Sequence, residues 1–551
     1  MPGHQTFPWR FSMRPNTPSN RARLRWERLL PLLAGLLPFL FSACMTYRVD
    51  SLADAPDANP GDSKCERAVS LESEAGAPPD GLCTLRAAVM ESNASIWPDT
   101  VEVPNGLYQL TLAGGGSLPI TDGVKIQGSG ASNTIIDGQG RGMVFHVQSE
   151  GLELNNLTVQ GGNSQVGGGI QIDAGTSEFH EIVIRQNEAF TGGGGLSVNN
   201  GATVRIHRSA IIDNFATGAF GGGIWNGGEL WVYDSTIANN DSNRAGGIRN
   251  DGEMNLRNTT VSGNLAHSPE AGTGGIYQGG FAVLNNVTLT NNTGAGNEAG
   301  ANRGGGIQIG NGKITVVKNS IIAGNHGGIG PNDCVGELSG DSKYNLIGDT
   351  TECTIPSHLS TFLLNVDPLI GPLTTANGGP TQTHLPSGNS PVLEAGYQFP
   401  PPAVDGCEVR DQRGVPRPQG TGRCDMGAVE VTSANTFVVG LTLVNADTNT
   451  DIRQLLHGDT LVLSELPPEL SIRADLAGAP VGSVVFDYDD TTAIQTENVA
   501  PYALAGDNPV GDYHPFNLTT GSHTLTATPF AEGEGSGAAG GSRTIIFSVK
   551  Q

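Results

Sequence analysis

The chain has 551 residues, of which 54 are acidic and 30 are basic, so its formal net charge is −24. Charged residues make up 15% of the chain and glycine accounts for 79 residues, a composition that excludes a coiled coil or a helical bundle. The length exceeds that of one ordinary globular core, so we expect several domains or one repetitive domain. The acidic balance repels phosphate backbones and argues against nucleic acid as a partner.

The first 43 residues indicate export. Four arginines between positions 21 and 28 precede an apolar run, 29–41, that is too short to span a membrane and has the length of a signal-peptide core. The run ends at Phe41-Ser42-Ala43-Cys44, and small residues directly before a cysteine resemble a bacterial lipoprotein signal, in which that cysteine is acylated and becomes the first residue. Ordinary cleavage near Ala43 is the alternative. Residues 44–60, rich in Asp, Ala and Pro, are then predicted to be a flexible tether.

The remaining six cysteines form three couples that are close in sequence. An even number of cysteines after an export signal indicates disulfides rather than a zinc site, because no Cys-x-x-Cys motif occurs. The predicted pairs are Cys65–Cys83, Cys334–Cys353 and Cys407–Cys424.

Internal repetition is the strongest signal in the sequence. A Gly-Gly-aliphatic phrase recurs six times with a period near 27 residues, and an asparagine recurs in step with it: Asn187, Asn214, Asn240, Asn264, Asn292 and Asn325. Three and eight residues before each asparagine stand apolar residues, a spacing typical of short strands and not of helices. These columns predict a β-solenoid of about nine coils over 101–345, in which like residues stack and the asparagine amides bond along the axis. Ile237 is predicted to face the core and Thr236 to face outward.

The segments on either side of the repeat differ from it in composition and in hydrophobic pattern. Residues 83–93 are the one clear helical stretch and, within 61–100, are predicted to cap the first coil. The Pro- and Gly-rich segment 346–432 is predicted to cap the last coil. From 435 to 551, alternating strands separated by turns indicate a β-sandwich.

Several motifs resemble known bacterial families. Residues 83–94 (CTLRAAVMESNA) are similar to the CSLREAI-type motif of secreted β-helix proteins, and the Gly-Gly-Ile and Asn repeats resemble those of polymorphic outer membrane proteins and of the pectate-lyase-like superfamily. Residues 367–396 and 411–430 are similar to the choice-of-anchor Q domain, and 482–489 with 497–507 resemble a bacterial Ig-like module. The resemblance implies an all-β protein: a right-handed parallel β-helix with caps, followed by an Ig-like domain, at a cell surface or secreted.

Two classes of function fit these features: a non-catalytic adhesin or glycan-binding rod, which we favour, and a polysaccharide lyase or hydrolase that acts along one sheet. A lyase needs a basic residue and a cation that neutralises a uronate, whereas a hydrolase needs paired carboxylates, and no Asp-Asp pair occurs between 101 and 345. The weak catalytic candidates are outward residues of the repeat: Arg208, Asp234, Arg257 and Lys318.

The expected partners are a polysaccharide or another cell-surface glycan, with a membrane engaged only through the lipid on Cys44. No cofactor is required, and calcium is the one that the sequence allows, at Asp487, Asp489 and Asp490 in the last domain. The residue that follows Cys44 is Met45 and not Asp, which favours sorting of the lipoprotein to the outer membrane. Without acylation the protein would be extracellular.

Overall fold

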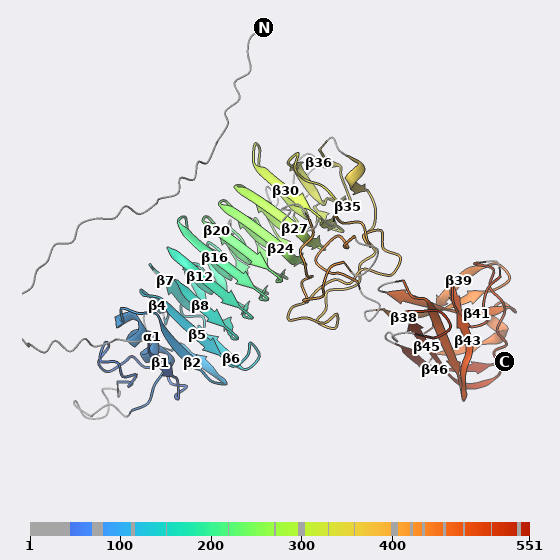
Figure 1. Cartoon of the computed structure of the whole chain (residues 1–551), viewed down its shortest axis with the longest axis horizontal. Helices are drawn as coiled ribbons and strands as arrows, with labels where there is room; N and C mark the ends of the chain where they lie inside the picture. The colour runs from blue at the N-terminus through green and yellow to red at the C-terminus, as the bar shows by residue number, and fades with distance from the viewer. Residues whose placement is uncertain are drawn as a thin grey trace, which may run out of the picture. The chain divides into compact units, whose positions relative to one another are not determined.

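The repeat forms a parallel β-helix. The computed structural model describes residues 44–551 except 69–80, 112–115, 150, 219, 269–271, 296–303, 329, 357–358, 398–405, 419–422, 432–435, 456–458, 478–479, 509 and 537–541. Successive coils stack from the N-terminal to the C-terminal end of the repeat, and each strand pairs in parallel with its equivalents in the coils before and after (Figure 1). From β2 to β30 one ladder contains nine strands, which confirms the predicted number of coils.

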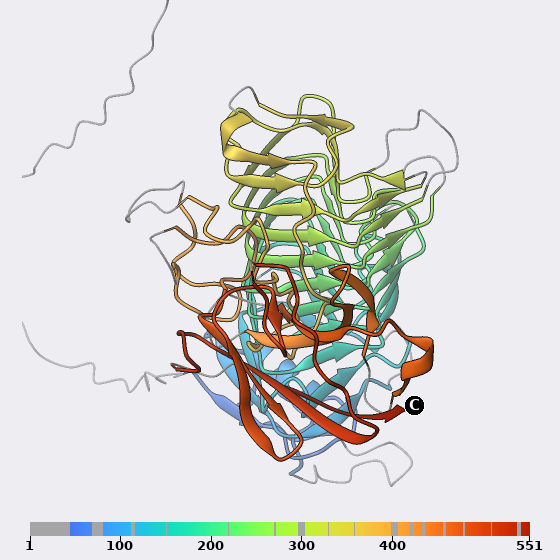
Figure 2. The same ribbon diagram turned by 90° about the vertical axis from the view of Figure 1, so that its right-hand side faces the viewer.

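Three sheets enclose the core of the helix (Figure 2). The largest sheet contains two ladders, which the long strands β24 (Glu253–Ser262) and β27 (Phe281–Thr290) join. Its first ladder also contains β1 (Thr46–Arg48), β2 (Asp99–Val103), β5 (Val124–Gly128), β8 (Leu152–Asn155), β12 (Gly175–His180), β16 (Ala202–His207), β20 (Glu229–Tyr233) and β30 (Ile314–Lys318). Its second ladder also contains β3 (Gly106–Gln109), β6 (Thr134–Asp137), β9 (Thr158–Gln160), β13 (Val183–Arg185), β17 (Ala210–Ile212), β21 (Thr236–Ala238), β31 (Ile321–Ala323), β35 (Asn345–Ile347) and β37 (Phe362–Leu364).

The two other sheets are built from shorter strands. One contains β4 (Leu118–Ile120), β7 (Phe145–Val147), β11 (Ile170–Ile172), β15 (Leu196–Val198), β19 (Ile224–Asn226), β23 (Ile248–Asn250), β26 (Ile276–Gln278), β29 (Ile307–Ile309), β34 (Cys334–Glu337) and β36 (Glu352–Thr354). The other contains β10 (Asn163–Val166), β14 (Glu188–Thr191), β18 (Phe215–Ala216), β22 (Asp241–Ser242), β25 (Leu265–Ala266), β28 (Thr293–Gly294), β32 (His326–Gly327) and β33 (Gly330–Pro331).

The predicted apolar columns are buried in the core between the sheets. The residues eight positions before each asparagine are fully buried, and so are those three positions before it, including Ile237. Because a strand turns alternate side chains to opposite faces, these columns leave the residues between them on the outer surface of the helix. This outer surface carries the candidate site.

The predicted asparagine ladder is present and continuous. Each amide Nδ2 donates to the Oδ1 of the asparagine in the next coil, at 2.8 to 3.0 Å, and the same Oδ1 accepts the backbone N–H of the preceding asparagine. The ladder runs from Asn187 to Asn325 and ends on Asp333, whose Oδ1 accepts both the backbone N–H and the Nδ2 of Asn325 at 2.8 Å. A buried amide needs partners above and below it, so the ladder holds the coils in one register.

The carboxyl group that ends the ladder makes stability depend on pH. Burial raises the pKa of Asp333 from 3.8 to about 6, against the hydrogen bonds from Asn325 that favour the charged form. A carboxyl whose pKa is higher in the folded state binds more protons when folded, so its contribution to stability falls as the pH rises from about 4 to about 6.

Asp333→Asn keeps an oxygen that can accept from Asn325 but removes the charge. We expect the free energy of unfolding of the variant, relative to that of the parent, to increase by up to about 3 kcal/mol between pH 4 and pH 7. Urea unfolding at a series of pH values measures this difference. A difference that does not change with pH would contradict the raised pKa.

The N-terminal segment is folded, which corrects the prediction of a flexible tether over 44–60. Strand β1 pairs in parallel with β2, Tyr47 and Val49 are buried, and Asp57 lies 5% exposed beside helix α1 (Leu85–Ala94). The predicted helical stretch is α1, which begins after Thr84, the residue whose side chain accepts the backbone N–H of Ala87. The apolar residues of this segment reach the same core as the coils, so its composition was a poor guide to its order.

Helix α1 holds the first layer together through two charged side chains. Arg86 pairs with Asp54 at 2.6 Å and also donates to the carbonyls of Gly116 and Ser117. Glu91, buried at 1% exposure, accepts the backbone N–H groups of Gly61 and Ser63. The Arg of the CTLRAAV motif therefore joins the N-terminal segment to the start of the coils.

Residues 366–431, which we call the flank segment, do not cap the last coil as predicted. They lie along the outer face of the largest sheet, over β21, β24 and β27 (Figure 2). Hydrogen bonds join the coils to the flank segment, for example Ser262 to His384 (2.9 Å), Thr260 to Gln412 (2.7 Å) and Asn258 to the carbonyl of Arg410 (2.7 Å). An apolar cluster adds to them, in which Val392 and Met426 pack on Ile321 and Leu346. Two buried ion pairs, Arg413–Asp411 and Arg417–Glu430, stabilise the flank segment itself.

Thr236 shows the consequence of this arrangement. It faces outward as predicted but is fully buried, because its Oγ1 donates to the carbonyl of Gln382 (2.6 Å) and accepts from Gln412 (3.0 Å). An outward position in a solenoid should tolerate a charged residue, but at position 236 the flank segment would bury it. Thr176, an outward threonine of β12 on the other ladder of the same sheet, is exposed and serves as a control.

We expect Thr236→Asp to lower the free energy of unfolding by about 3 kcal/mol, because the new carboxylate would be buried without a partner. Thr176→Asp should change it by less than about 0.5 kcal/mol, as surface substitutions do. Ile237→Asp, in the core between the sheets, should prevent folding. Thermal unfolding of the three variants checks this order, and equal melting temperatures for the two Thr variants would contradict the position of the flank segment.

All three predicted disulfides are present. Cys65–Cys83 lies in the first layer, Cys334–Cys353 joins β34 to β36, and Cys407–Cys424 lies within the flank segment, with Cα atoms 5.0, 5.1 and 6.5 Å apart. Three disulfides indicate an exported protein that folds in an oxidising compartment.

The C-terminal residues 437–550 form two sheets around a core of their own, centred on Leu441, Phe486 and Phe547. One sheet contains β38 (Phe437–Asn445), β39 (Thr450–Gln454), β41 (Leu470–Ala477) and β44 (Tyr502–Ala503). The other contains β40 (Thr460–Val462), β42 (Ser483–Tyr488), β43 (Thr491–Glu497), β45 (Gly521–Phe530) and β46 (Arg543–Lys550). Two short 3-10 helices are also present, η1 (Leu359–Thr361) before β37 and η3 (Leu463–Glu465) after β40.

Candidate functional site

One row of outward side chains follows the first ladder of the largest sheet from coil to coil. Strand register places ten residues in this row, which we call the outer row: Arg48, Glu102, Gln127, Asn155, His180, His207, Tyr233, Arg257, Asn285 and Lys318. A second row, two residues earlier on each strand, includes Lys125, Glu153, Glu178, Arg205 and Trp231. Together they form a polar and aromatic surface with the strand spacing of about 4.8 Å.

Four rings stand next to one another on this surface. The imidazoles of His180 and His207 stack at 4.8 Å, and His207 stacks on Tyr233 at 4.7 Å, with planes within 7° of parallel. Trp231 lies beside Tyr233, with ring centroids 6.4 Å apart. Burial, together with the nearby charge of His180, lowers the pKa of His207, so this ring is neutral at pH 7. Stacking fixes the orientation of these rings on the surface.

The charges of the two rows balance between Arg48 and Tyr233. Lys125 pairs with Glu153 at 2.7 Å, and Arg205 lies 3.5 Å from Glu178. Arg48 is the register neighbour of Glu102. Although burial opposes it, hydrogen bonds from Lys125 and Asn155 lower the pKa of Glu153 and keep its carboxylate charged. This surface thus carries local charge but no excess of either sign.

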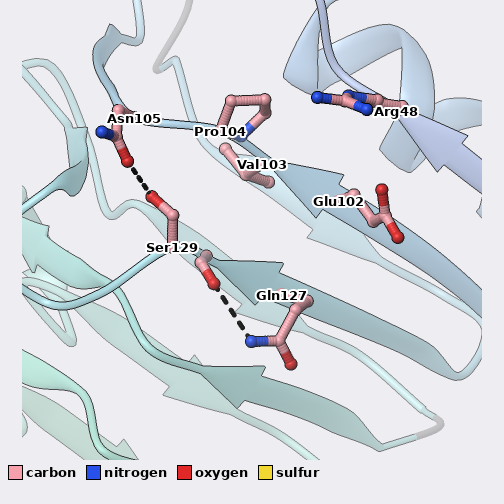
Figure 3. A pocket seen from close by; sticks show the side chains of 8 residues that line it. Arg48, Glu102, Val103, Pro104, Asn105, Gln127 and Ser129 are labelled. Atoms are coloured by element: carbon pink, nitrogen blue, oxygen red, sulfur yellow. Dashed lines mark hydrogen bonds between the residues drawn. The ribbon is translucent and has the colours of Figure 1, made fainter.

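The outer row begins in a hollow of about 530 Å³ between β1, β2 and β5 (Figure 3). Arg48 and Glu102 project from neighbouring strands, and Ser129 donates to Asn105 at the opposite side of the hollow. Gln127 donates its Nε2 to the carbonyl of Gly128 at 3.0 Å, which leaves its own side-chain oxygen for a ligand. The hollow therefore combines a guanidinium, a carboxylate and amides, with Val103 and Pro104 as apolar surface.

The flank segment covers the other end of the row. Arg257 lies 3.3 Å from Glu408, and Asn285 donates both to Glu408 (2.9 Å) and to the carbonyl of Gly406 (3.0 Å). The accessible part of the outer row therefore runs from Arg48 to Tyr233, except for the buried Asn155, and ends where Glu408 contacts Arg257 and Asn285. We call this part the open face.

The four catalytic candidates from the sequence are engaged by other protein groups or lie apart. Arg208 is exposed and pairs with Glu181 at 2.9 Å, whereas burial raises the pKa of Asp234, which accepts from Asn258. Arg257, in the coil after Asp234, lies 3.3 Å from Glu408, and Lys318 is two strands further along the row, about 10 Å away by strand spacing. Arg208, Asp234 and Arg257 thus occupy three successive coils, and each has a protein partner of its own.

The calcium candidates are parts of a turn in the C-terminal domain. Asp489 accepts from His523 (2.8 Å) and from the backbone of Thr524, and Asp487 accepts the backbone N–H of Ala493. No group of three or more His, Cys, Asp or Glu side chains in the described part of the chain is arranged to hold a metal ion. Calcium binding at Asp487, Asp489 and Asp490 stays a prediction of the sequence.

Sequence reasoning missed several residues of the open face. Arg48 was assigned to a tether, and Glu102, Gln127 and Trp231 were not singled out. Trp231 could have been found, because it is two residues before Tyr233 and a strand turns both to the same side. Arg48 could not, because its position depends on the pairing of β1 with a strand 54 residues later.

Comparisons with known proteins add little to this picture. No protein-family model and no curated protein matches the chain. Among solved structures, pectate lyase Pel9A is similar with a TM-score of 0.38 and 12% identity over 71% of this chain and 97% of its own. The ORF18 protein of Geobacillus virus E2 has a TM-score of 0.23 and 14% identity over 50% of this chain and 53% of its own. The parallel β-helix described above rests on the strand register of this chain, and no argument below uses either likeness.

Proposed function

We propose that this protein is an exported, surface-attached β-helix that binds a glycan chain along its open face without cleaving it. The observation that carries the proposal is the row from the hollow at Arg48 to the rings of His207 and Tyr233, whose side chains, apart from Asn155, are exposed or half-buried. Six strand intervals separate the two ends, so the open face is about 29 Å long, which suits a linear polymer.

The side chains of the open face suit a sugar polymer in their chemistry. Tyr and Trp supply rigid contact area with a polar atom at the edge, at a low cost in conformational entropy. Gln127 carries both donors and an acceptor, as hydroxyl groups require. Stacking and ion pairs hold these groups in place before a ligand arrives, and this reduces the entropy lost on binding.

The charge balance favours a neutral glycan over a uronate polymer. Three cations and three carboxylates lie on the two rows between Arg48 and Tyr233, and the protein as a whole is strongly acidic. A polyanion would meet repulsion from the carboxylates and would have to displace them from their partners.

The family features named from the sequence belong to the same proposal. The right-handed sense of the coils, the CSLREAI-like first layer, the choice-of-anchor Q-like flank segment and the Ig-like C-terminal domain are all supported by the motifs quoted above. A polysaccharide lyase or hydrolase is the alternative, and the engagement of Arg208, Asp234 and Arg257 by Glu181, Asn258 and Glu408 is the reason we favour binding.

The glycan prediction is tested with paired ring variants. Trp231→Ala with Tyr233→Ala should weaken binding to neutral polysaccharides at least tenfold, because two aromatic contacts of about 1 kcal/mol each are lost. The matched control is Trp225→Ala with Tyr277→Ala. These two rings share one register row on strands β19 and β26 of the ten-stranded sheet, and this variant should bind as the parent does. Affinity electrophoresis in gels that contain neutral glucans, galactans or xylans, or polygalacturonate, measures both variants.

The same panel separates binding from catalysis. New unsaturated or reducing ends released by the parent protein would contradict the binding proposal in favour of the enzyme. Equal weakening by both pairs of substitutions would show that the open face is not the site.

For anchoring, we propose that Cys44 is acylated and becomes the N-terminus. One support is the apolar run 29–41 followed by Ser42, Ala43 and Cys44; residues 1–43 lie outside the described residues. The other is Cys44 itself, which is exposed and takes part in none of the three disulfides. In the described part of the chain, no helix has the length and hydropathy to cross a bilayer.

Cys44→Ser should release the protein from the membrane fraction or leave it unprocessed, without change in its melting temperature. Two or three acyl chains attach a protein stably to a membrane, whereas a protein without acyl chains has no such anchor. Cell fractionation and the mass of the N-terminal peptide measure this. A variant that fractionates and is cleaved as the parent is would show that the protein is secreted without a lipid.

A further inference from the structure

The position of Cys44 on the fold is defined by its neighbours. The backbone N–H of Met45 donates to Asp99 at 2.7 Å, the backbone N–H of Thr100 donates to the carbonyl of Met45, and β1 begins at Thr46. The Cα atom of Cys44 can therefore be at most about 7 Å from that of Thr46. An acyl chain on Cys44 would bring the first layer of the helix to within a few ångströms of the bilayer.

Exposed apolar side chains are concentrated in that layer. Beside Cys44 lie Met45 (38% exposed) and, in the turn after α1, Ile96 (79%) and Trp97 (47%). Leu52, Leu82 and Leu107 are also exposed there, whereas in the described residues between 108 and 189 no large apolar side chain is. The turn is held by hydrogen bonds between Ser95 and Trp97, so Trp97 is presented in a fixed position two residues before Asp99, the partner of Met45.

We propose that the first layer of this protein rests on the lipid bilayer, with Ile96 and Trp97 in the interface beside acylated Cys44. The inference rests on the acylation proposed above and adds a second, non-covalent contact. Tryptophan prefers the level of the lipid headgroups, and Ile and Met bury apolar surface below it. The protein then stands directly on the membrane, without the spacer that a tether would provide.

The charge of the layer indicates which lipid it contacts. The exposed charged residues between 44 and 68 are two cations, Arg48 and Lys64, and two carboxylates, Asp50 and Asp62. With no excess of positive charge, the layer is not attracted to anionic lipid, and the contact depends on apolar burial at an uncharged interface. Vesicles of phosphatidylcholine and phosphatidylethanolamine are therefore the appropriate probe.

The test uses tryptophan fluorescence of the mature chain from Cys44, in which the tryptophans are Trp97, Trp225 and Trp231. Cys44 is coupled through its thiol to a maleimide lipid with a single acyl chain, so that attachment does not depend on acylation in the cell. The variant W225F/W231F reports on Trp97. Its matched control W97F/W225F reports on Trp231, which lies on β20, five strands beyond β2 in the first ladder.

We expect the emission of Trp97 to shift to shorter wavelength on vesicles, to be quenched by lipids brominated near the headgroup and to lose its quenching by iodide. Trp231 should show none of these changes. Because one acyl chain binds only marginally, I96S/W97S should also lower vesicle partitioning about tenfold, whereas I494S/V499S, which removes two exposed apolar side chains from the C-terminal domain, should not.

Attached protein in which Trp97 stays as accessible to iodide as in solution would overturn the inference. So would protection of Trp97 without vesicles that grows with protein concentration, because a second copy of the chain would then cover the layer. Failure of acylation is seen separately, in the mass of the N-terminal peptide from cells. If Cys44 is unmodified in cells but Trp97 contacts lipid on the coupled vesicles, the acylation proposal is wrong and the bilayer contact of the first layer still holds.

Discussion

The buried amide ladder is the interaction on which the rest of this structure depends. Each asparagine from Asn187 to Asn292 donates to the next one, Asn325 donates to Asp333, and all of them have almost no exposure to water. A coil displaced by one residue would leave buried donors and acceptors unpaired on both sides, at a cost of several kcal/mol. Register is therefore the same in every coil, and so the outward residues also form rows. The stacked rings of His180, His207 and Tyr233 exist because of this register.

What the sequence could predict follows from the same repetition. The ladder, the buried columns that include Ile237 and the three disulfides depend on residues that recur at a fixed period or lie within 19 positions of each other. The position of the flank segment depends on contacts between residues more than 120 positions apart, such as Ser262 with His384, and no period encodes them. The order of residues 44–60 was missed for a similar reason, since Asp, Ala and Pro are typical of tethers, and only the pairing of β1 with β2 shows that Tyr47 and Val49 are core residues.

The candidate site could be predicted only in part. Alternation places Tyr233 and Arg257 on the outer surface, but it makes them equivalent, whereas Arg257 pairs with Glu408 of the flank segment and Tyr233 stacks on His207. The hollow at Arg48 was missed because its first strand was assigned to a linker. The structure thus divides one regular row into a covered part, which is bonded to Glu408 and Gly406, and an open part that remains for a ligand.

Hydroxyl-radical footprinting of the parent protein, with and without a bound neutral polysaccharide, tests most directly whether the open face is the binding site. Aromatic side chains react readily when accessible, and the chain carries rings on two different sheets. The account predicts that bound glycan protects Trp231 and Tyr233 on the open face and leaves Trp225 and Tyr277 on the ten-stranded sheet as reactive as before. Protection of Trp225 and Tyr277 with no change at Trp231 and Tyr233 would contradict it.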